Sequence, residues 1–424
     1  MPMLPHRPAA PTAARDVAVP AAWEVPERPR PPAQAAARGL PAGWLVERLA
    51  AGEVARHREA WLDLMGRALE PNVFLDPDFA LPAAQHLGGG RAVALVLIWT
   101  DAARRPSDLI GLHALVPRGG AARLLAASWL HDLSTLGAPL LDADRAEAAL
   151  RALLAWAAGG LPGVPGLLFR ALPEPGPTAS ALRAAAAAGG HAVALIDAQE
   201  RAVLRRGAAR AGLAALSPKS AKELRRQRRR LAERGTLTYA SAREGRSLGE
   251  ALEHFLALEA SGWKGTAGTA LLARPGETAF VRTASRLLGR RGLWRVDSLS
   301  AGGEPVAMAL LLRARDTDFL WKIAYRESAA RLSPGVQLAL QITEAQLGDG
   351  AVALTDSCAV PRHPMIDRLW RDRLRVADIA VATRPGASRG FRAVLVAERG
   401  LRRLRAGLKR ALAAWRAARP GGGD

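Results

Sequence analysis

The stretch WKIAYRESAARLSPGVQL, residues 321–338, changes character halfway along its length. Its first five residues predict a β-strand, and its last ten predict a tight turn that opens a helix. In the turn, Ser333 suits the helix N-cap, Pro334 suits the first helical position, and Gly335 lets another molecule approach the backbone. First-turn amides lack intrahelical partners and lie at the positive helix end, where an anion gains about 0.3–2 kcal/mol. The stretch therefore predicts either an anion-binding corner or a capped helix without a ligand.

Three strands are predicted in quick succession just before this turn, at 293–300, 306–314 and 319–325. The segments AGGEP and RDTD between them are rich in the residues that tight reversals require. These strands therefore form an antiparallel meander. After the turn come the predicted helix, 334–347, and one more strand, 351–357.

The upstream part of the chain predicts a second unit with the same coarse plan. A helical pattern begins near Trp44 and is stopped by Pro71 and Asn72. Strands and helices alternate after it, with strands at 91–99, 109–118, 166–172 and 191–198 and helices at 143–158 and 178–188. A duplicated α/β (α+β) fold is the resulting hypothesis. The predicted divisions are a disordered Pro/Ala/Arg-rich tail, 1–40, two halves, 41–205 and 206–385, and a basic C-terminal segment, 386–424.

The composition is strongly basic, with 60 Lys and Arg against 39 Asp and Glu and a net charge of +21. Either genome base composition or a polyanionic partner explains such an Arg- and Ala-rich chain. The single cysteine, Cys358, excludes an internal disulfide and suits a reducing compartment. No apolar run reaches the roughly 18 residues of a membrane span, and prolines interrupt the N-terminus where a signal peptide needs an apolar stretch. A cytoplasmic location is predicted.

Two predicted helices concentrate the positive charge. The helix 217–234 has Leu224 and Leu231 as its only large apolar residues, so most of its surface is solvated or faces a partner. The segment 401–415 places leucines and Trp415 on one stripe with arginines opposite. That segment either docks on its own domain or rests on the anionic inner face of a membrane.

Residues 217–380 resemble the GNAT acyltransferases, and among them the CelD-like acetyltransferases related to cellulose biosynthesis. Besides the opening stretch, the resemblance is carried by LRRQRRRLAERGTL (224–237), FLALEASGWKG (255–265) and GEPVAMALLL (303–312). Upstream, 61–79 also looks like that family's N-terminal half. The resemblance implies two GNAT-like halves, each a mixed, mostly antiparallel sheet flanked by helices. It also implies acyl-CoA bound by the second half and acyl transfer to an amine or hydroxyl in polysaccharide or cell-envelope metabolism.

The same resemblance implies how acyl-CoA, such as acetyl-CoA, is held. The pyrophosphate would lie on the turn that opens the helix, and the thioester carbonyl would meet backbone N–H groups at the end of the preceding strand. The cofactor-binding residues this implies are Ile323, Ala324, Arg331, Ser333, Gly335, Val336 and Gln337. The sequence departs from the GNAT pattern Arg/Gln-x-x-Gly-x-Gly/Ala, because Gly335 comes one position late after Arg331 and Gln337 replaces a small residue.

Direct acyl transfer needs a base for the nucleophile and an acid for the leaving thiolate. Tyr325, at the end of the strand, is the candidate acid, with a half-buried strand tyrosine as the alternative. The loop 355–370 supplies His363 or Asp356 as the candidate general base, unless Asp356 only caps the loop. A nucleophilic pair of Cys358 and His363 is weaker, since a lone cysteine after a strand is usually packing.

Two Trp-Lys pairs, Trp263–Lys264 and Trp321–Lys322, are candidates to line the acceptor groove. Apolar packing of the indoles with exposed lysines is the alternative. No spacing of Cys, His or carboxylates fits a metal site, so no metal is expected.

Three functions remain open from the sequence. The first is an acyl-CoA-dependent N- or O-acyltransferase with an unidentified acceptor. The second is a Fem-type transferase that takes aminoacyl groups from tRNA and uses the basic helix on RNA. The third is a catalytically inactive binding protein on the same scaffold.

Overall fold

The computed structural model describes residues 40–87, 93–116, 125–208 and 210–418, so the predicted tail lies almost entirely outside the described residues. The first half begins with a strand and ends with a long one. Its elements are β1 (Leu45–Ala50), α1 (Ala51–Val54), α2 (Arg58–Gly66), α3 (Pro77–Leu87), β2 (Ala94–Trp99), β3 (Leu109–Val116), β4 (Ala126–Ser128), β5 (Leu140–Leu141), α4 (Ala146–Gly160), β6 (Gly166–Pro173), α5 (Pro177–Ala188) and β7 (His191–Arg205).

The second half has the same plan and is followed by a long helix. Its elements are α6 (Pro218–Ala232), β8 (Leu237–Ala242), α7 (Gly245–Ser261), α8 (Trp263–Thr266), α9 (Pro275–Gly289), β9 (Trp294–Ala301), β10 (Glu304–Ala314), β11 (Thr317–Tyr325), the 3-10 helix η6 (Glu327–Leu332), α10 (Pro334–Gly348), β12 (Leu354–Asp356), α11 (Ile366–Leu369), β13 (Asp372–Pro385) and α12 (Arg389–Ala418). The meander and the helix after it were predicted within a few residues of these bounds.

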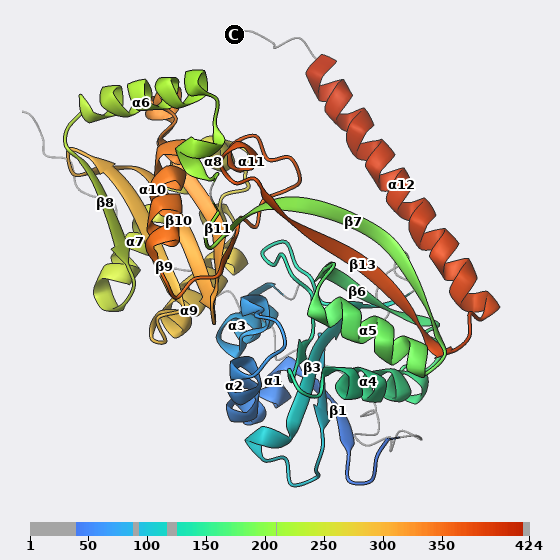
Figure 1. The fold of residues 1–424 in the computed structure, drawn as a ribbon. Coiled ribbons are helices and arrows are strands. Elements are labelled where there is room, and N and C mark those ends of the chain that lie inside the picture. Colours follow the sequence, from blue (N-terminus) through green and yellow to red (C-terminus); the bar gives the residue numbers. More distant parts are fainter. Residues whose placement is uncertain (1–39, 88–92, 117–124, 209, 419–424) are drawn as a thin grey trace, which may run out of the picture. The chain divides into compact units, whose positions relative to one another are not determined.

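The strands join into one 13-stranded mixed sheet (Figure 1). Its order is β1-β2-β3-β4-β6-β13-β7-β12-β11-β10-β9-β8, with β5 paired to β3. Among the described pairings, β4 with β6 and β11 with β12 are parallel, and the others are antiparallel. The predicted fold class, a mixed and mostly antiparallel sheet flanked by helices, is confirmed. The two halves share this sheet instead of forming two separate ones.

The strand order reads the same from either end, which reveals a duplication. Starting at one edge, β1-β2-β3-β4-β6 matches β8-β9-β10-β11-β12 at the other, and in each set the last pairing is parallel. The final strand of each half crosses over: β13 pairs with β6 of the first half, and β7 pairs with β12 of the second. The two crossing strands also pair with each other over most of their length (Figure 1).

One sequence prediction is wrong at the start of the first half. The helical pattern expected from Trp44 is a strand over Leu45–Ala50, which pairs with β2 from Leu45 opposite Trp99 to Ala50 opposite Ala94. The helix begins only at Ala51. The apolar spacing in LVERLA fits either element, and pairing with a fully buried neighbouring strand decides between them.

Helices cover both faces of the sheet in the second half. On one face, α7 and α9 bury Phe255 and Phe280 against alternate strand residues such as Met308 and Leu310. On the other face, α10 packs on the intervening residues, including Ala309. Because side chains alternate along a strand, each residue of β11 belongs to one of these two faces.

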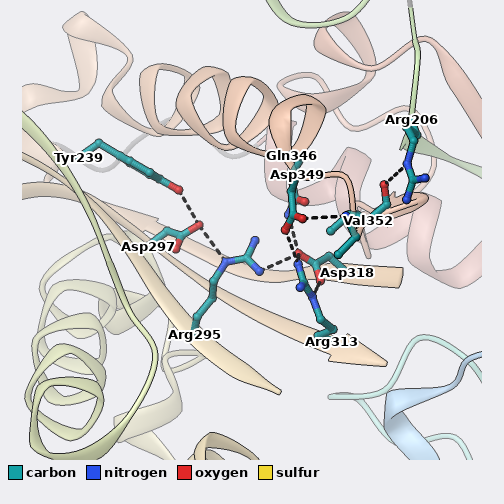
Figure 2. A network of polar contacts seen from close by, with 10 residues as sticks. Arg206, Tyr239, Arg295, Asp297, Arg313, Asp318, Gln346, Asp349 and Val352 are labelled. Carbon is teal, nitrogen blue, oxygen red and sulfur yellow. Dashed lines mark hydrogen bonds and ion pairs between the residues drawn. The ribbon is translucent and has the colours of Figure 1, made fainter. Parts of the chain in front are cut away.

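A buried network of charges fixes α10 to its sheet (Figure 2). Asp318 is fully buried and accepts hydrogen bonds from Arg295 (2.6 Å), Arg313 (2.6 Å) and Gln346 of α10 (2.6 Å). Burial would by itself raise the pKa of Asp318, but the guanidinium groups of Arg313 and Arg295 outweigh burial and lower it. The helix is therefore held at its C-terminal end by paired charges, which leaves its N-terminal end to meet other groups.

Candidate functional site

Strand β11 is paired on both sides for only part of its length. Residues 317–319 pair with 354–356 of β12, whereas the pairing with β10 continues to Tyr325. From 320 to 325, no described strand lies on the β12 side. β12 thus diverges from β11 and leaves an open strand edge.

A β-bulge lies where the open edge begins. Leu310 of β10 is opposite Lys322 and Leu311 is opposite Leu320, so Trp321 is the extra residue. Bulges of this kind redirect neighbouring side chains and occur next to functional sites. Here the bulge puts Trp321 and Lys322 on the same face of the sheet, because Trp321 and the cross-strand partner Leu310 both belong to the core under α7 and α9.

The open edge presents backbone groups of Ile323 and Tyr325. The N–H of Arg326 donates to Val306 of β10 at 2.9 Å, so by strand alternation the amide of Ala324 also faces β10. The amides of Ile323 and Tyr325 then face away from β10, and the Ile323 carbonyl accepts from Lys264 Nζ at 3.3 Å. Of the three backbone positions considered for the thioester, Ile323 and Tyr325 face the open edge and Ala324 does not.

The start of α10 lies beside this edge. Ser333 occupies the N-cap with φ +52°, but its side chain makes no capping hydrogen bond, so the predicted side-chain cap is wrong. In the part of the chain that the structure describes, the amides of Gly335 and Val336 have no acceptor, whereas Gln337 N–H donates to the Ser333 carbonyl at 3.0 Å. Two main-chain donors are thus free at the positive end of a 15-residue helix.

Gly335 lies close to β11. A Cβ added there would meet Tyr325 Cδ1 at 3.4 Å, Met365 Sδ at 3.8 Å and Ile323 Cδ1 at 3.9 Å. The predicted phosphate ligand Gln337 is committed elsewhere, because its buried side-chain amide donates to the Leu224 carbonyl of α6 at 2.9 Å. The start of α10 is therefore bounded by β11 on one side and by the basic helix α6 on another (Figure 1).

The charges at this corner favour an anion. Arg331 is exposed, lies at the end of η6 just before α10, and has no ion-pair partner among the described residues. The first turn of α10 contains no acidic residue. In the first half, the equivalent helix α4 has Glu147 in its first turn, and Asp142 just before it accepts the N–H groups of Asp144 and Arg145. Asp142 and Glu147 are paired with Arg67 and Arg151, so of these two equivalent helices only α10 begins without a carboxylate.

A small pocket that is open to solvent lies at the end of β11. It is lined by Leu258, Glu259, Gly262, Trp263, Lys264, Ile323, Ala324, Tyr325 and Glu327. The Trp263 side chain is 58% exposed, and the backbone N–H of Trp263 donates to Glu327 Oε1 at 3.4 Å. The pocket is formed mainly by α7, α8 and β11, so it approaches the open edge from the face opposite α10.

The predicted acceptor residues divide between two roles. Lys264 and Trp263 line the pocket, and Lys264 Nζ is paired with the buried Glu259 at 2.8 Å. Trp321 is 8% exposed, and its indole N–H donates to the Leu133 carbonyl of the first half at 2.9 Å, so it packs in the core. Lys322 is half-buried, with Nζ 5.6 Å from the Trp321 ring centroid.

Tyr325 lies near the start of α10, and His363 belongs to the loop that also brings Met365 there. Burial and the Glu327 carboxylate raise the pKa of Tyr325, so its hydroxyl stays protonated at neutral pH. Burial lowers the pKa of His363, while Asp367 opposes that shift. The Nδ1 atom of His363 accepts the N–H of Met365 at 3.3 Å, which places the proton of the neutral ring on Nε2. In this arrangement His363 has no free lone pair with which to act as a base.

Asp356 is held in a buried ion pair. Its carboxylate accepts from Arg201 Nε at 2.7 Å and Nη2 at 2.5 Å, and from the backbone N–H of Cys358 at 2.9 Å. Arg201 belongs to β7 and also donates to the Thr135 carbonyl at 3.1 Å. Burial raises the pKa of the Cys358 thiol well above its usual range, so this cysteine is inert packing. Asp356 therefore links the second half to β7 of the first half through its ion pair with Arg201, and it does not line the pocket.

Two carboxylates that line the pocket, those of Glu259 and Glu327, were not predicted as site residues. Glu327 lies in the stretch 321–338, and Glu259 lies in FLALEASGWKG, so both belong to segments on which the sequence analysis drew. No local pattern distinguishes them from surface glutamates. Their role depends on which elements β11 meets in space.

Family comparison agrees with this geometry. Residues 218–357 match the family model of the acetyltransferase (GNAT) domain. A search of curated proteins found no match. The matched range contains the meander, the open edge and the start of α10, so these parts of the second half are similar to a GNAT acetyltransferase domain.

Solved structures of similar fold span most of the chain at low identity. FemX covers 79% of this chain and 96% of its own, with 9% identity and a TM-score of 0.49. The C-terminal domain of a putative lysylphosphatidylglycerol synthetase from Agrobacterium fabrum covers 77% and 91%, with 13% identity and a TM-score of 0.47. A tandem GNAT protein of the clavulanic acid pathway covers 81% and 99%, with 15% identity and a TM-score of 0.35. Identities this low do not define a function.

Proposed function

We propose that the protein is an acyl-CoA-dependent acyltransferase whose acceptor is an amine. One observation carries the proposal: the open edge of β11 lies between a helix start with free amides and a pocket on the opposite face of the sheet. A diphosphate suits the free N–H groups of Gly335 and Val336, with Arg331 as an added positive charge. The acyl end of the donor then reaches the pocket along the edge.

The pocket favours a cationic acceptor, although the chain as a whole carries a net charge of +21. Glu327 offers a carboxylate at the mouth, and the exposed Trp263 offers an aromatic face that attracts a cation. Glu259 is neutralised by Lys264, which leaves Glu327 as the negative group that an ammonium would meet. An amine acceptor fits these groups better than a neutral hydroxyl.

The proposed chemistry is direct transfer. With the thioester carbonyl on the Ile323 amide, the acceptor nitrogen attacks the carbonyl carbon from the pocket, a C–N bond forms and the C–S bond breaks. Glu327 takes the proton from the acceptor, and the protonated Tyr325 hydroxyl donates to the leaving thiolate. The sequence-predicted bases, His363 and Asp356, stay predictions, and their hydrogen bonds favour Glu327 instead.

Thermal unfolding with and without acetyl-CoA tests the proposal. A ligand that binds only the folded state raises the midpoint temperature of unfolding. At a ligand concentration of a hundred times Kd, it adds about 2.7 kcal/mol to the free energy of unfolding. Release of free CoA thiol with a panel of amines then reports turnover. No stabilisation by any acyl-CoA would reject the transferase.

A Fem-type transferase that uses aminoacyl-tRNA is the alternative that the basic face of α6 favours. Lys219, Lys222, Arg225 and Arg229 are exposed there. RNA binding through such a face weakens steeply as the salt concentration rises. Stabilisation by CoA does not require the basic face of α6. An inactive binding protein would show neither thiol release nor aminoacyl transfer. Membership of the CelD-like branch stays a prediction.

The helix α12 supports peripheral binding to an anionic membrane as a second property. Its first part docks on the sheet through the buried Phe391 and through Arg402, which pairs with Asp378 at 2.8 Å. Leu404 and Leu408, beyond that contact, are 60% and 56% exposed on a helix rich in arginine. None of the described helices has the length and apolar character that a membrane span needs. An apolar stripe flanked by cations suits the surface of anionic phospholipid.

A further inference from the structure

Lys322 occupies a distinctive place on β11. It directly precedes Ile323, whose amide faces the open edge, and the bulge at Trp321 turns it toward the face that α7 and α9 cover. Ala324, two residues further on the same face, lines the pocket. The Lys322 side chain therefore lies on the acceptor side of the sheet, one residue before the open edge, while Lys322 itself does not line the pocket.

Among the described residues Lys322 has no counter-ion, although its cationic neighbours do. Lys264 is paired with Glu259 at 2.8 Å, and Arg274 is paired with Glu277 at 2.7 Å. No carboxylate lies within ion-pair distance of Lys322 Nζ among the described residues, and its nearest described ring contact is the Trp321 indole. A half-buried ammonium without a partner is unfavourable, so this site disfavours the charged form of the amine.

The electrostatics point the same way. Burial lowers the pKa of Lys322, and the charges of Lys264 and Arg274 add to this effect while those of Glu259 and Glu277 oppose it. Only the neutral amine has the lone pair needed to attack a carbonyl. Each unit by which a lysine pKa falls raises the neutral fraction about tenfold near neutral pH.

We propose that Lys322 is a self-acylation site that accepts the acyl group of bound acyl-CoA when the pocket holds no acceptor. The inference rests on the proposed function. The neutral Nζ attacks the thioester carbon, a C–N bond forms, the C–S bond breaks, and the proton lost by nitrogen ends on the CoA thiol. The product is a stable amide on Lys322. It removes one positive charge from the acceptor side of β11.

Lys264 is the internal control for this inference. Lys264 Nζ donates to the Ile323 carbonyl at 3.3 Å, so Lys264 also lies at the open edge. If proximity alone decided the reaction, Lys264 would be acylated as well. Its Nζ donates to the buried Glu259 carboxylate at 2.8 Å, so this nitrogen is held in an ion pair instead of being free to attack. The structure therefore predicts modification of Lys322 and not of Lys264.

The experiment incubates the purified chain with acetyl-CoA, and separately with octanoyl-CoA, and maps acylated lysines by peptide mass spectrometry. Calorimetry measures binding of each acyl-CoA to the same preparation. Gly335→Glu serves as the variant that blocks the helix start, and Lys322→Arg keeps the charge but removes the nucleophile. The exposed Lys219 and Lys222 report the uncatalysed background.

The expected result is Lys322 occupancy at least about tenfold above that of Lys264, lost in Gly335→Glu and absent in Lys322→Arg. Binding of acyl-CoA without modification of Lys322 overturns the self-acylation inference and leaves the transferase proposal standing. Equal modification in Gly335→Glu also overturns it, because the reaction would then not depend on the site. No binding of either acyl-CoA overturns both.

Discussion

Gly335 is the residue at which a single substitution should disturb the proposed donor site most. Its backbone lies outside the positive-φ region, and an added Cβ would rest 3.4 Å from the Tyr325 ring, an ordinary contact. Gly335→Ala should therefore fold normally and weaken acetyl-CoA binding several-fold, because the methyl group crowds the approach to the free amides. Gly335→Glu should abolish binding, since a carboxylate would replace the diphosphate.

The control for that prediction lies on the same helix. Gly348, at the far end of α10, has nothing within 4 Å of an added Cβ. Gly348→Glu should leave acetyl-CoA affinity unchanged in calorimetry. Equal affinity of Gly335→Glu and the unmodified protein would remove the helix start from the donor site.

Tyr325→Phe tests the proton donor. Without its hydroxyl, the thiolate would leave without a proton, and turnover should fall about 10²-fold or more. Acetyl-CoA affinity should change little, because the ring that packs near Gly335 remains. Steady-state thiol release and calorimetry on the same sample separate these effects, and normal turnover would exclude Tyr325 as the acid.

His113 makes the stability of the protein depend on pH. Burial lowers its pKa to about 3, and its ring stacks on Phe169 at 5.1 Å. The folded state keeps the ring neutral, while the unfolded chain takes up a proton below about pH 6.5. The contribution of His113 to stability is therefore complete above pH 6.5. It is lost as pH falls toward 3, by up to about 1.4 kcal/mol per pH unit.

His113→Phe should flatten this acid dependence in urea unfolding between about pH 6.5 and 4, because phenylalanine binds no proton. His254, exposed on α7, is the matched control, and His254→Gln should leave the slope unchanged. An unaltered slope in His113→Phe would mean that other groups set the acid limb.

At the scale of elements, the buried charges under α10 couple the stability of the helix to that of the sheet. Asp318→Asn would leave Arg295 and Arg313 facing each other without their shared carboxylate (Figure 2). Losing one partner of a buried pair costs about 3–5 kcal/mol. Urea unfolding should detect this loss. Asp316→Asn, at the exposed neighbouring position in the turn, should cost less than about 0.5 kcal/mol.

Local patterns predicted the elements around the site and missed what joins them. The meander and the glycine-bearing turn follow from residues within a few positions of each other, such as those of AGGEP between β9 and β10. The pair of Arg201 and Asp356 spans 155 residues of sequence, and the pairing of β13 with β6 is equally remote. No periodicity records such contacts. The role proposed for Asp356 was therefore drawn without its partner in view.

At the scale of the whole molecule, α12 carries exposed leucines, Leu404 and Leu408, on an arginine-rich helix. The double substitution Leu404→Glu and Leu408→Glu should abolish flotation with vesicles of phosphatidylglycerol and phosphatidylcholine, because it places carboxylates on the exposed apolar stripe. Vesicles of pure phosphatidylcholine should bind the unmodified protein weakly. Leu272→Glu, at a leucine that is 38% exposed elsewhere, should float normally. Flotation that survives the double substitution would exclude α12 as the contact.

The exchange of β7 and β13 between the two repeats has a practical consequence for anyone who cuts the polypeptide. A nick in the connection between β7 and α6 would yield two fragments, yet each would still donate its terminal strand to the other. Such fragments should migrate together on a sizing column until denaturant separates them. Neither is expected to behave as an autonomous folding unit when produced alone.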